Sequence, residues 1–233
     1  RRKKKSSEPA KTTKTASKDN FITSRNLFPP RVDDLDSHIN LLHAYGWEES
    51  SFPSEWVYKF NQYLTGLTVM SNQVKKILID NGVSLPVKVC GLGVDHIDKL
   101  NDQTEYVISK KAYTFLHISS CFPRKGIDCL LNSYGCSFSN SDDVTLIIKT
   151  FNNEHNNIDF LLDKFYSLNP NFPDVNVIKS DLNEEEIKSL YQQSDALVAP
   201  SHGEGFNLTV AEAMRLGLPV ITTAWGGQMD FCN

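Results

Sequence analysis

Short apolar runs rich in β-branched residues alternate with amphipathic segments from residue 112 to the end of the chain. The apolar runs are predicted strands and cover 113–119, 143–150, 174–180, 195–200 and 218–223. The segments between them have apolar residues at helical spacing and predict helices over 125–138, 158–168, 184–193 and 208–217. Because uninterrupted apolar strands separated by helices are typical of a parallel sheet covered on both faces, this region predicts a doubly wound α/β fold.

Residues that favour helix ends support these boundaries. Asn183 is suited to be an N-cap with Glu186 at the third helical position, and Gly217 is suited to follow a helix C-terminus. Thr209 and Glu212 have the S/T-x-x-E spacing of a capping box. That box gives Glu212 a structural role, but it does not explain Glu204, eight positions earlier in a glycine-flanked loop.

A smaller series of the same kind precedes this region. Strands are predicted at 39–45, 67–70 and 86–91, and helices at 54–64 and 71–82, the second with Ser71 as N-cap and Gly82 at its end. The stretch 95–112 is polar and aperiodic, which indicates a linker between two α/β units. The first unit has three predicted strands and an open edge, and the second stops just after a strand. We therefore expect a fragment of a longer protein, in which both units are cut.

Charge is distributed unevenly along the 233 residues. Residues 1–18 carry eight Lys or Arg and one Glu, a charge of +7, so the formal charge of −4 leaves −11 on the remainder. The first 20 residues lack the apolar residues needed to offset their ordering entropy and are expected to form a disordered basic tail. A solvated tail is favoured over an arm that binds nucleic acid or a membrane surface. The acidic remainder argues against a nucleic-acid-binding protein.

Cysteine and histidine spacing argues against a structural metal or a disulfide framework. The five cysteines are odd in number and form no C-x-x-C pair, and the histidines form no H-x-x-x-H or H-E-x-x-H pair. Reduced thiols are typical of the cytosol, so we expect a cytoplasmic protein without a protein-ligated metal. The sequence contains no apolar run near the roughly 20 residues of a membrane span and no recognisable signal peptide.

Candidate chemistry lies where the predicted parallel strands end, since ligands of open α/β sheets bind beyond the carboxyl ends of the strands. These ends are 119–125, 149–153, 180–182 and 201–207. In the last, Gly203 and Gly205 permit close backbone approach, and the following helix presents free amides to an anion. Arg124 and Lys125 occupy another strand-to-helix turn, where a cationic pair opposes the helix dipole. Two such turns facing one gap would suit a diphosphate. In the alternative interpretation, the glycines only turn the chain and the basic pair is solvated.

The sequence resembles the retaining glycosyltransferases of group 1 (family 4). The resemblance is carried by Glu204 and Glu212 in a Glu-x7-Glu motif within EGFNLTVAEAMRLGLPVITT, and by PRKGIDCLL, GLGVD and residues 56–83. It covers about residues 25–233. The resemblance implies the GT-B fold, in which two Rossmann-like parallel-sheet domains face a cleft. Here 21–94 would be the C-terminal part of the acceptor-side domain, 95–111 the inter-domain linker, and 112–233 a truncated donor-binding domain.

The resemblance also implies roles for individual residues. Glu212 would bind the ribose hydroxyls of the nucleotide, Glu204 would lie near the donor sugar, and Lys125 would neutralise the departing diphosphate. The backbone amides beside Glu204 would contact sugar or phosphate; these belong to Gly205, Phe206 and Asn207, with Gly203 on the other side.

Two positions need separate comment. The family has an arginine upstream of the lysine, where this chain has Ser119 and Ser120. Either Arg124 assists Lys125, or backbone amides and hydroxyls replace the missing guanidinium. His43 matches a histidine that follows an early strand in the acceptor-side pocket of the family, although a lone histidine at a strand end is as often structural.

The predicted function is transfer of a sugar from a nucleotide-sugar donor to a hydroxyl acceptor with retention of configuration. The acceptor would be a sugar or glycolipid in surface polysaccharide assembly, in the cytoplasm or at the inner face of the membrane. No cofactor or nucleic-acid partner is expected. Two alternatives stay open: a nucleotide-sugar epimerase of the same fold, and a module that binds nucleotide-sugar without turnover.

Overall fold

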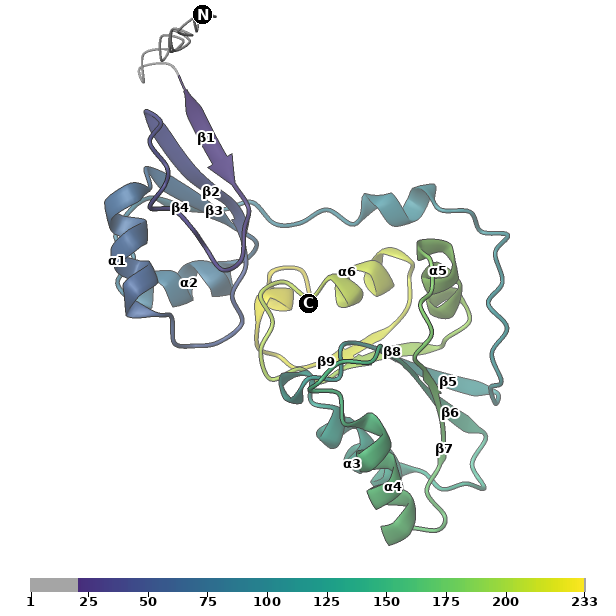
Figure 1. Ribbon diagram of the computed structural model, residues 1–233. Coiled ribbons are helices and arrows are strands. Elements are labelled where there is room, and N and C mark those ends of the chain that lie inside the picture. The colour runs from purple at the N-terminus through teal and green to yellow at the C-terminus, as the bar shows by residue number, and fades with distance from the viewer. Residues whose placement is uncertain (1–20, 233) are drawn as a thin grey trace, which may run out of the picture.

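Two separate parallel sheets organise the computed structural model, which describes residues 21–232 (Figure 1). The predicted tail at 1–20 lies outside these residues. The first sheet has the order β1-β2-β3-β4 and the second the order β7-β6-β5-β8-β9. Each strand pairs in parallel with its neighbours. The chain is therefore an α/β protein with two parallel-sheet lobes, as the sequence predicts.

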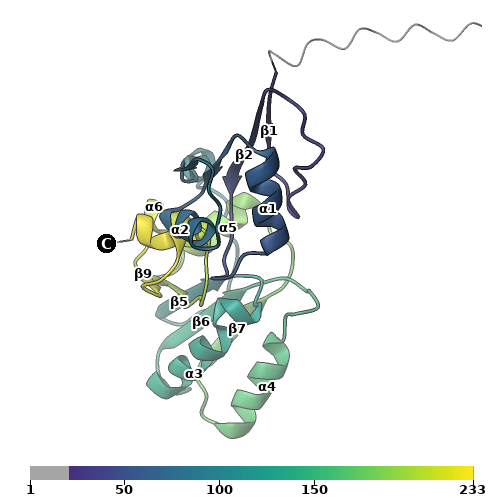
Figure 2. The same ribbon diagram turned by 90° about the vertical axis from the view of Figure 1, so that its left-hand side faces the viewer.

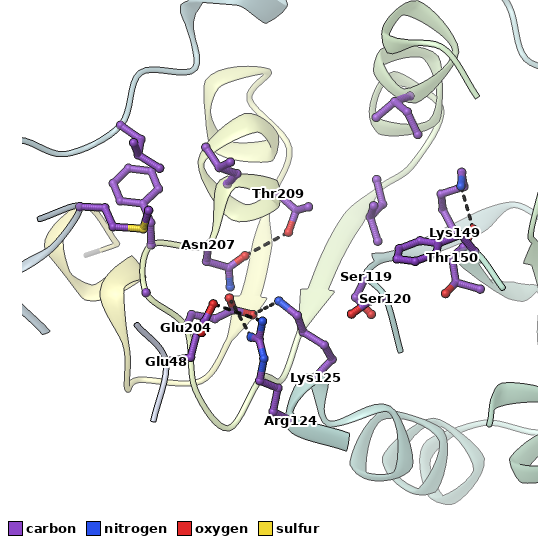
Figure 3. Close-up of a pocket in the computed structure, with 18 residues that line it drawn as sticks. Glu48, Ser119, Ser120, Arg124, Lys125, Lys149, Thr150, Glu204, Asn207 and Thr209 are labelled. Atoms are coloured by element: carbon purple, nitrogen blue, oxygen red, sulfur yellow. Dashed lines mark hydrogen bonds and ion pairs between the residues drawn. The ribbon is translucent and has the colours of Figure 1, made fainter. Parts of the chain in front are cut away.

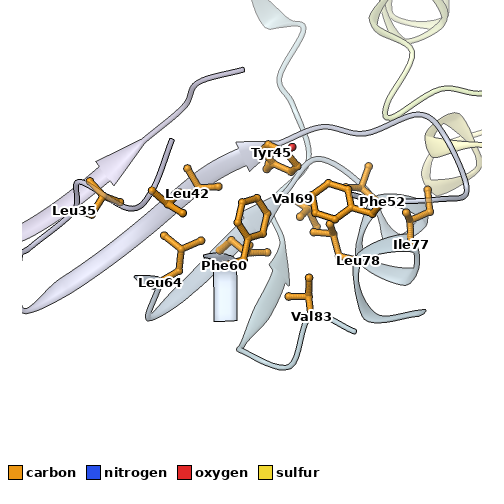
Figure 4. Packing of buried hydrophobic residues seen from close by; sticks show 13 residues of the cluster. Leu35, Leu42, Tyr45, Phe52, Phe60, Leu64, Val69, Ile77, Leu78 and Val83 are labelled. Atoms are coloured by element: carbon orange, nitrogen blue, oxygen red, sulfur yellow. The ribbon is translucent and has the colours of Figure 1, made fainter. Parts of the chain in front are cut away.

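The first lobe contains one strand more than expected. Its elements are β1 (Ile22–Arg25), β2 (Ile39–Tyr45), α1 (Ser54–Tyr63), β3 (Gly66–Val69), α2 (Asn72–Asp80) and β4 (Val87–Val89). The prediction of three strands is wrong because β1, with the sequence ITSR, is a short edge strand without a buried residue. Such a strand has no apolar alternation to reveal it. The core of this lobe lies between the sheet and its two helices and includes Leu42, Phe60 and Leu78 (Figure 4).

All five strands and four helices predicted in the second lobe are present. They are β5 (Tyr113–Ile118), α3 (Ile127–Ser137), β6 (Val144–Lys149), α4 (Ile158–Leu168), β7 (Asp174–Ile178), α5 (Glu184–Gln192), β8 (Ala196–Ala199), α6 (Leu208–Arg215) and β9 (Val220–Thr222). Strand β6 is buried at every position. Its alternate side chains enter two cores, Ile147 with residues of α5 and α6, and Leu146 and Ile148 with residues of α3 and α4. This two-sided burial explains the uninterrupted apolar run.

The predicted linker is bound to the second lobe along much of its length. It begins with a 3-10 turn, η2 (Asp95–Lys99), in which Ile97 is buried in the core of the second lobe. The Lys188 amine donates to the Leu100 carbonyl at 2.9 Å, and the Tyr106 amide donates to the Ser189 hydroxyl at 3.0 Å. Residues 95–111 are therefore tied to α5.

Most of the predicted helix ends are confirmed, and one is wrong. Ser71 caps α2, Asn183 and Glu186 form the capping box of α5, and Gly82 and Gly217 have positive φ after their helices. The Thr209–Glu212 box does not form, because α6 begins at Leu208 and its N-cap is Asn207, with φ of 74° and no side-chain cap bond. Thr209 lies inside the first turn, where its hydroxyl donates to the Asn207 side-chain oxygen at 3.0 Å.

The two lobes meet in several places. Near the end of the chain, η4 (Gly227–Asp230) lies beside α2 in both views (Figures 1 and 2), and the Asn72 amide donates to Asp230 Oδ2 at 2.7 Å. A second contact joins Arg124, in η3 (Pro123–Lys125) after β5, to Glu48 of the first lobe, with 3.3 Å between Nη2 and Oε1. The carboxyl ends of the two sheets thus face one another across a shared boundary.

We predict that Gly126→Ala destabilises the second lobe much more than Gly217→Ala. Both glycines have positive φ, 69° and 77°, but a Cβ at Gly126 would lie 2.2 Å from the Pro200 carbonyl oxygen, whereas nothing lies within 4 Å of one at Gly217. The left-handed conformation alone should cost about 1–2 kcal/mol. The clash between α3 and the end of β8 should add about 1–3 kcal/mol. Urea unfolding of both variants measures the difference, and equal losses would contradict this account.

Candidate active site

A cavity of about 450 Å³ lies at the carboxyl ends of β5, β6 and β8 and is closed on one side by the first lobe (Figure 3). The second lobe contributes most of the lining, through the ends of these strands, the loop before α6 and the start of that helix. The first lobe contributes Glu48 and Met70. The cavity therefore occupies the place where ligands bind in open parallel sheets. Of the sequence-predicted residues, it brings together Ser119, Ser120, Arg124, Lys125, Glu204, Gly205, Phe206 and Asn207.

Two cations converge on the buried carboxylate of Glu204 (Figure 3). The residue is 6% exposed. Lys125 Nζ lies 2.5 Å from Oε1, and Arg124 Nη1 lies 3.5 Å from Oε2 and 3.0 Å from the Gly203 carbonyl oxygen. A buried carboxylate is stable only when it is paired and hydrogen-bonded, so this cluster must be held by the surrounding fold. It brings negative and positive charge to one wall of the cavity.

The glycines of the loop before α6 permit close contact with the other lobe. A Cβ at Gly203 would lie 2.6 Å from the Glu48 carbonyl oxygen, and one at Gly205 would lie 3.2 Å from the Trp47 carbonyl oxygen. The glycines predicted to permit close backbone approach thus face the backbone of residues 47–48. The absence of a side chain is required at Gly203 and favours the close contact at Gly205.

Asn207 presents a donor without a protein partner. The residue is 7% exposed and lines the cavity, with its backbone in the left-handed region at φ of 74°. Its side-chain oxygen accepts from Thr209, while Nδ2 finds no acceptor among residues 21–232. An unsatisfied buried donor is unfavourable unless something pairs with it. A ligand with hydroxyl or phosphate oxygens would supply that acceptor.

The Ser119 hydroxyl forms its hydrogen bonds within the protein, with His117 and Cys121. His117 is buried and accepts or donates at both nitrogens: Nδ1 lies 2.7 Å from the Val198 carbonyl oxygen, and Nε2 lies 2.7 Å from the Ser119 hydroxyl. Burial lowers the pKa of His117 to about 4, so the ring is neutral. Since a carbonyl can only accept, Nδ1 carries the proton and Nε2 accepts from Ser119. The Ser119 hydroxyl also accepts from the Cys121 amide at 3.0 Å. Its proton is thus committed within the protein, whereas the Ser120 hydroxyl forms no hydrogen bond within residues 21–232.

Glu212 lies one turn beyond the cavity wall. Its carboxylate accepts from the Tyr191 hydroxyl at 2.8 Å, with His96 Nε2 at 3.5 Å from the other oxygen. Burial raises the pKa of Tyr191 far above its ordinary value, and the negative charge of Glu212 raises it further. The phenol therefore stays protonated and acts as a donor. Leu208, four positions earlier on the same helix face, lines the cavity. Glu212 therefore faces the same side of α6, but it does not line this cavity.

His43 lies outside the cavity. The residue is exposed in β2, and its Nδ1 is 2.8 Å from the Ser24 hydroxyl oxygen. A second cavity of about 470 Å³ lies at the carboxyl end of the first sheet and shares Glu48 and Met70 with the first. Ala44 lines it, and His43 does not. The acceptor-side role of His43 therefore stays a prediction that its present contacts do not favour.

Lys149 and a cluster of three polar residues were not singled out as candidates from the sequence, although Lys149 begins the strand end 149–153 considered there. Lys149 ends the buried strand β6 and lines the cavity; a lysine closing a run of five apolar or β-branched residues was the available signal. Asp128 and Cys129 of α3 and His202 of the loop after β8 place their ligand atoms within 4.8 Å of one another. All three are exposed and none lines the cavity, so they are not part of this site. The expectation of no bound metal stays a prediction.

The chain belongs to the glycosyl transferases of group 1. The sequence model of that family matches residues 98–233, more than half of the chain and the whole of the second sheet. The match confirms the predicted membership of group 1, while assignment to family 4 stays a prediction. Retention of configuration and the roles of single residues stay predictions. A comparison with curated proteins finds no match. Among residues 21–232, none of the helices is long and apolar enough to cross a membrane.

Solved structures share the fold at low sequence identity. HepE of Anabaena, in complex with UDP and glucose, aligns with a TM-score of 0.64 and 19% identity over 84% of this chain and 55% of HepE. Sucrose-phosphate synthase of Thermosynechococcus elongatus aligns at 0.61 and 16% over 85% and 53%. The pneumococcal O-GlcNAc transferase GtfA, in complex with UDP and GlcNAc, aligns at 0.57 and 17% over 84% and 40%. The likeness establishes the GT-B fold, and this chain spans about half the length of the first two structures.

We predict that His117 makes the protein less stable as pH falls. Its pKa of about 4 in the folded protein lies below the ordinary 6.5, so the unfolded chain takes up a proton first. Stability is full above about pH 6.5 and falls until about pH 4, by about 3 kcal/mol in total. Between pH 7.5 and 5.5, above the range of most carboxyl groups, the loss should be about 1.3 kcal/mol.

The measurement is urea unfolding of wild type and His117→Gln at both pH values. Because Gln does not titrate, the variant should lose less stability than wild type over this interval, whatever its absolute stability. Equal slopes would show that His117 is not buried in its neutral form.

Proposed function

We propose that the protein is a glycosyltransferase that moves a sugar from a nucleotide-sugar donor to a hydroxyl group of an acceptor. The observation that carries this proposal is the convergence of Arg124 and Lys125 on Glu204 in the cavity between the lobes. Membership of the group 1 family supports the reaction class. HepE and GtfA, which share the fold, are described in complex with UDP and a sugar. UDP is therefore the first nucleotide to test.

The β5–α3 turn would receive the diphosphate. Negative charge develops on the diphosphate as the bond to the sugar breaks, and cations already held in place stabilise it without reorganisation. Lys125 and Arg124 are such cations, because ion pairs with Glu204 and Glu48 hold them in position. The helix α3 begins directly after Gly126, so its free amides add to the same field.

The loop before α6 would receive the sugar. Glu204 would face the sugar ring, with the amides of Gly205, Phe206 and Asn207 as neighbouring donors. The unpaired Nδ2 of Asn207 supports this assignment, since a sugar hydroxyl or a phosphate oxygen would satisfy it. Glu212 would bind the ribose hydroxyls from one turn further along the same helix face. The Tyr191 hydroxyl bond would hold its carboxylate for that contact.

We also propose that transfer proceeds with retention, as the resemblance to the retaining family implies. Among residues 21–232, the cavity carboxylates Glu204 and Glu48 are both paired with cations, so neither is free to form a covalent intermediate with the sugar, and the acceptor would attack from the face that the diphosphate leaves. Departure of a stabilised diphosphate would then guide attack from the same face. A sugar or glycolipid of surface polysaccharide assembly would be the acceptor. The five free cysteines, all within residues 21–232, fit a reducing compartment and a cytoplasmic site of action.

The test is product analysis. The chain is incubated with UDP-sugars and then other nucleotide sugars, with and without simple hydroxyl acceptors, and the products are separated by mass and by the anomeric NMR signal. Sugar on a new acceptor, with the donor's anomeric configuration, supports the proposal. An isomerised donor indicates an epimerase, and binding without conversion indicates a nucleotide-sugar-binding module.

We predict that Lys125→Ala weakens binding of the preferred nucleoside diphosphate by about 10- to 150-fold. The reason is loss of a charge-assisted contact worth about 1.5–3 kcal/mol. The matched variant is Arg124→Ala, from the same turn. The Lys125 side chain is 18% exposed and that of Arg124 33%, so a contact made by Lys125 is less screened by solvent and its loss should matter more. Calorimetric titration of UDP, GDP and ADP measures both. Wild-type affinity in Lys125→Ala with a loss in Arg124→Ala would assign the phosphate contact to Arg124.

We predict that Glu212→Gln weakens nucleotide binding by about 1.5–3 kcal/mol, because a charged acceptor for the ribose is lost. The fold should change little, since the Gln side-chain oxygen can still accept from the Tyr191 hydroxyl. Tyr191→Phe is the matched control: it leaves the carboxylate in place and removes a buried hydrogen bond worth about 1 kcal/mol. It should therefore lower the melting temperature more and the affinity less. A large melting-temperature loss with unchanged affinity in Glu212→Gln would make Glu212 a structural residue.

A further inference from the structure

Strand β6 ends in a buried lysine that no carboxylate neutralises. Lys149 is 8% exposed, and every residue of its strand is buried. Its amine donates to the Thr150 carbonyl at 2.8 Å. Within residues 21–232, no Asp or Glu oxygen lies within 4.0 Å of it, and Asp181 acts only through a longer-range attraction. Because burial withdraws the ammonium from water, it lowers the pKa of Lys149 below its ordinary value. One carbonyl bond is weak compensation for a desolvated charge.

The same lobe shows how a structural buried lysine is accommodated. Lys188 is 3% exposed, and its amine forms both a 2.7 Å ion pair with Asp102 and a 2.9 Å hydrogen bond to the Leu100 carbonyl. It fastens the linker to α5 and lines no part of the cavity. Lys149 is about as buried as Lys188, but within residues 21–232 it has no carboxylate partner like Asp102. The difference indicates that the partner of Lys149 comes from outside the protein.

The other two cations of the cavity are already balanced. Lys125 and Arg124 both contact Glu204, and Arg124 also contacts Glu48. Lys149 is on the neighbouring strand: Ile118 pairs with Lys149 in the β5–β6 register, and the Ser119 amide donates to the Lys149 carbonyl at 3.1 Å. Ser119 and Ser120 are drawn between Lys125 and Lys149 in Figure 3, and all four line the cavity. A ligand spanning this wall would have cations at both ends.

We propose that Lys149 is a phosphate-binding residue, which contacts the diphosphate of the nucleotide from the β6 side while Lys125 and Arg124 contact it from the β5–α3 turn. This inference rests on the proposed function, because it places the diphosphate in the same cavity. The Ser120 hydroxyl, which has no hydrogen bond within residues 21–232, is a further donor on that wall. Cations at both ends of the wall fit a diphosphate, whose two phosphoryl groups carry separate charges. A neutral sugar would leave Lys149 unpaired.

The test compares Lys149→Met with Lys164→Met in the full 233-residue chain. Lys164 is exposed on α4, so its variant removes the same charge from the lobe without touching the cavity. UDP, uridine and inorganic pyrophosphate are titrated by calorimetry. We expect Lys149→Met to bind UDP and pyrophosphate at least 10-fold more weakly than wild type, with uridine unchanged. Lys164→Met should bind all three as wild type does, and Lys149→Arg should retain part of the affinity.

Thermal unfolding without ligand separates a binding role from a structural one. Replacing an unpaired buried cation by an apolar side chain of similar length is expected to leave the melting temperature unchanged or raise it. A clear fall, together with unchanged UDP and pyrophosphate affinity, would make Lys149 structural and overturn the inference.

The outcomes also distinguish this inference from the proposed function. If wild type binds UDP and Lys149→Met binds it equally well, the Lys149 assignment fails and the function stands. If wild type binds pyrophosphate through Lys149 but binds no nucleoside diphosphate, the anion site stands and the nucleotide proposal fails. If wild type binds neither UDP, GDP or ADP nor pyrophosphate, both fail.

Discussion

The buried carboxylate of Glu204 is the constraint on which the rest of the site depends. A charge that is 6% exposed must be neutralised, and its two partners come from a turn about 80 residues earlier in the chain. Satisfying it therefore brings the end of β5 and the loop before α6 together. Arg124 extends the same network to Glu48, so the charge balance of the cavity includes the first lobe. The pairing of Glu204 thus links two strand ends of the second sheet and, through Arg124, connects them to the first lobe.

Close backbone contact makes that coupling possible. A Cβ at Gly203 would collide with the Glu48 carbonyl oxygen, one at Gly205 would be in tight contact with the Trp47 carbonyl oxygen, and one at Gly227 would lie 2.0 Å from the Gly205 carbonyl oxygen. Glycine lets three segments approach at the mouth of the cavity. The linker is fastened to α5 by Lys188 and Ser189, so the stretch near Gly91 is left as the connection between the lobes. The cavity thus lies at the boundary where both lobes supply lining residues.

Buried polar groups in the second lobe follow two distinct patterns. His117, Lys188 and Tyr191 are buried with good partners and fix the positions of Ser119, the linker and Glu212. Lys149 and the Asn207 amide are buried with poor partners or none, and both line the cavity. Since an unpaired buried polar group is unfavourable, the fold tolerates these two only because other interactions outweigh them. Thr114 Oγ1 and Gln228 Oε1 are also buried without a partner among residues 21–232, but they lie away from the cavity, so position in the cavity as well as poor pairing sets Lys149 and Asn207 apart.

The sequence by itself determined the elements of the second lobe. Each strand buried between helices requires a continuous apolar run, which is visible in the sequence, and capping residues such as Asn183 mark the helix ends. The sequence also placed Lys125, Arg124 and the Glu204 loop at strand ends that topology must bring to one edge. It could not reveal β1, whose exposed residues carry no pattern, or the pairing of Glu212 with Tyr191 in place of a cap with Thr209. Nor could it show that Lys149 lacks a carboxylate or that Gly203 faces the other lobe. Those facts are contacts between residues distant in the chain, and only tertiary packing decides which distant groups meet.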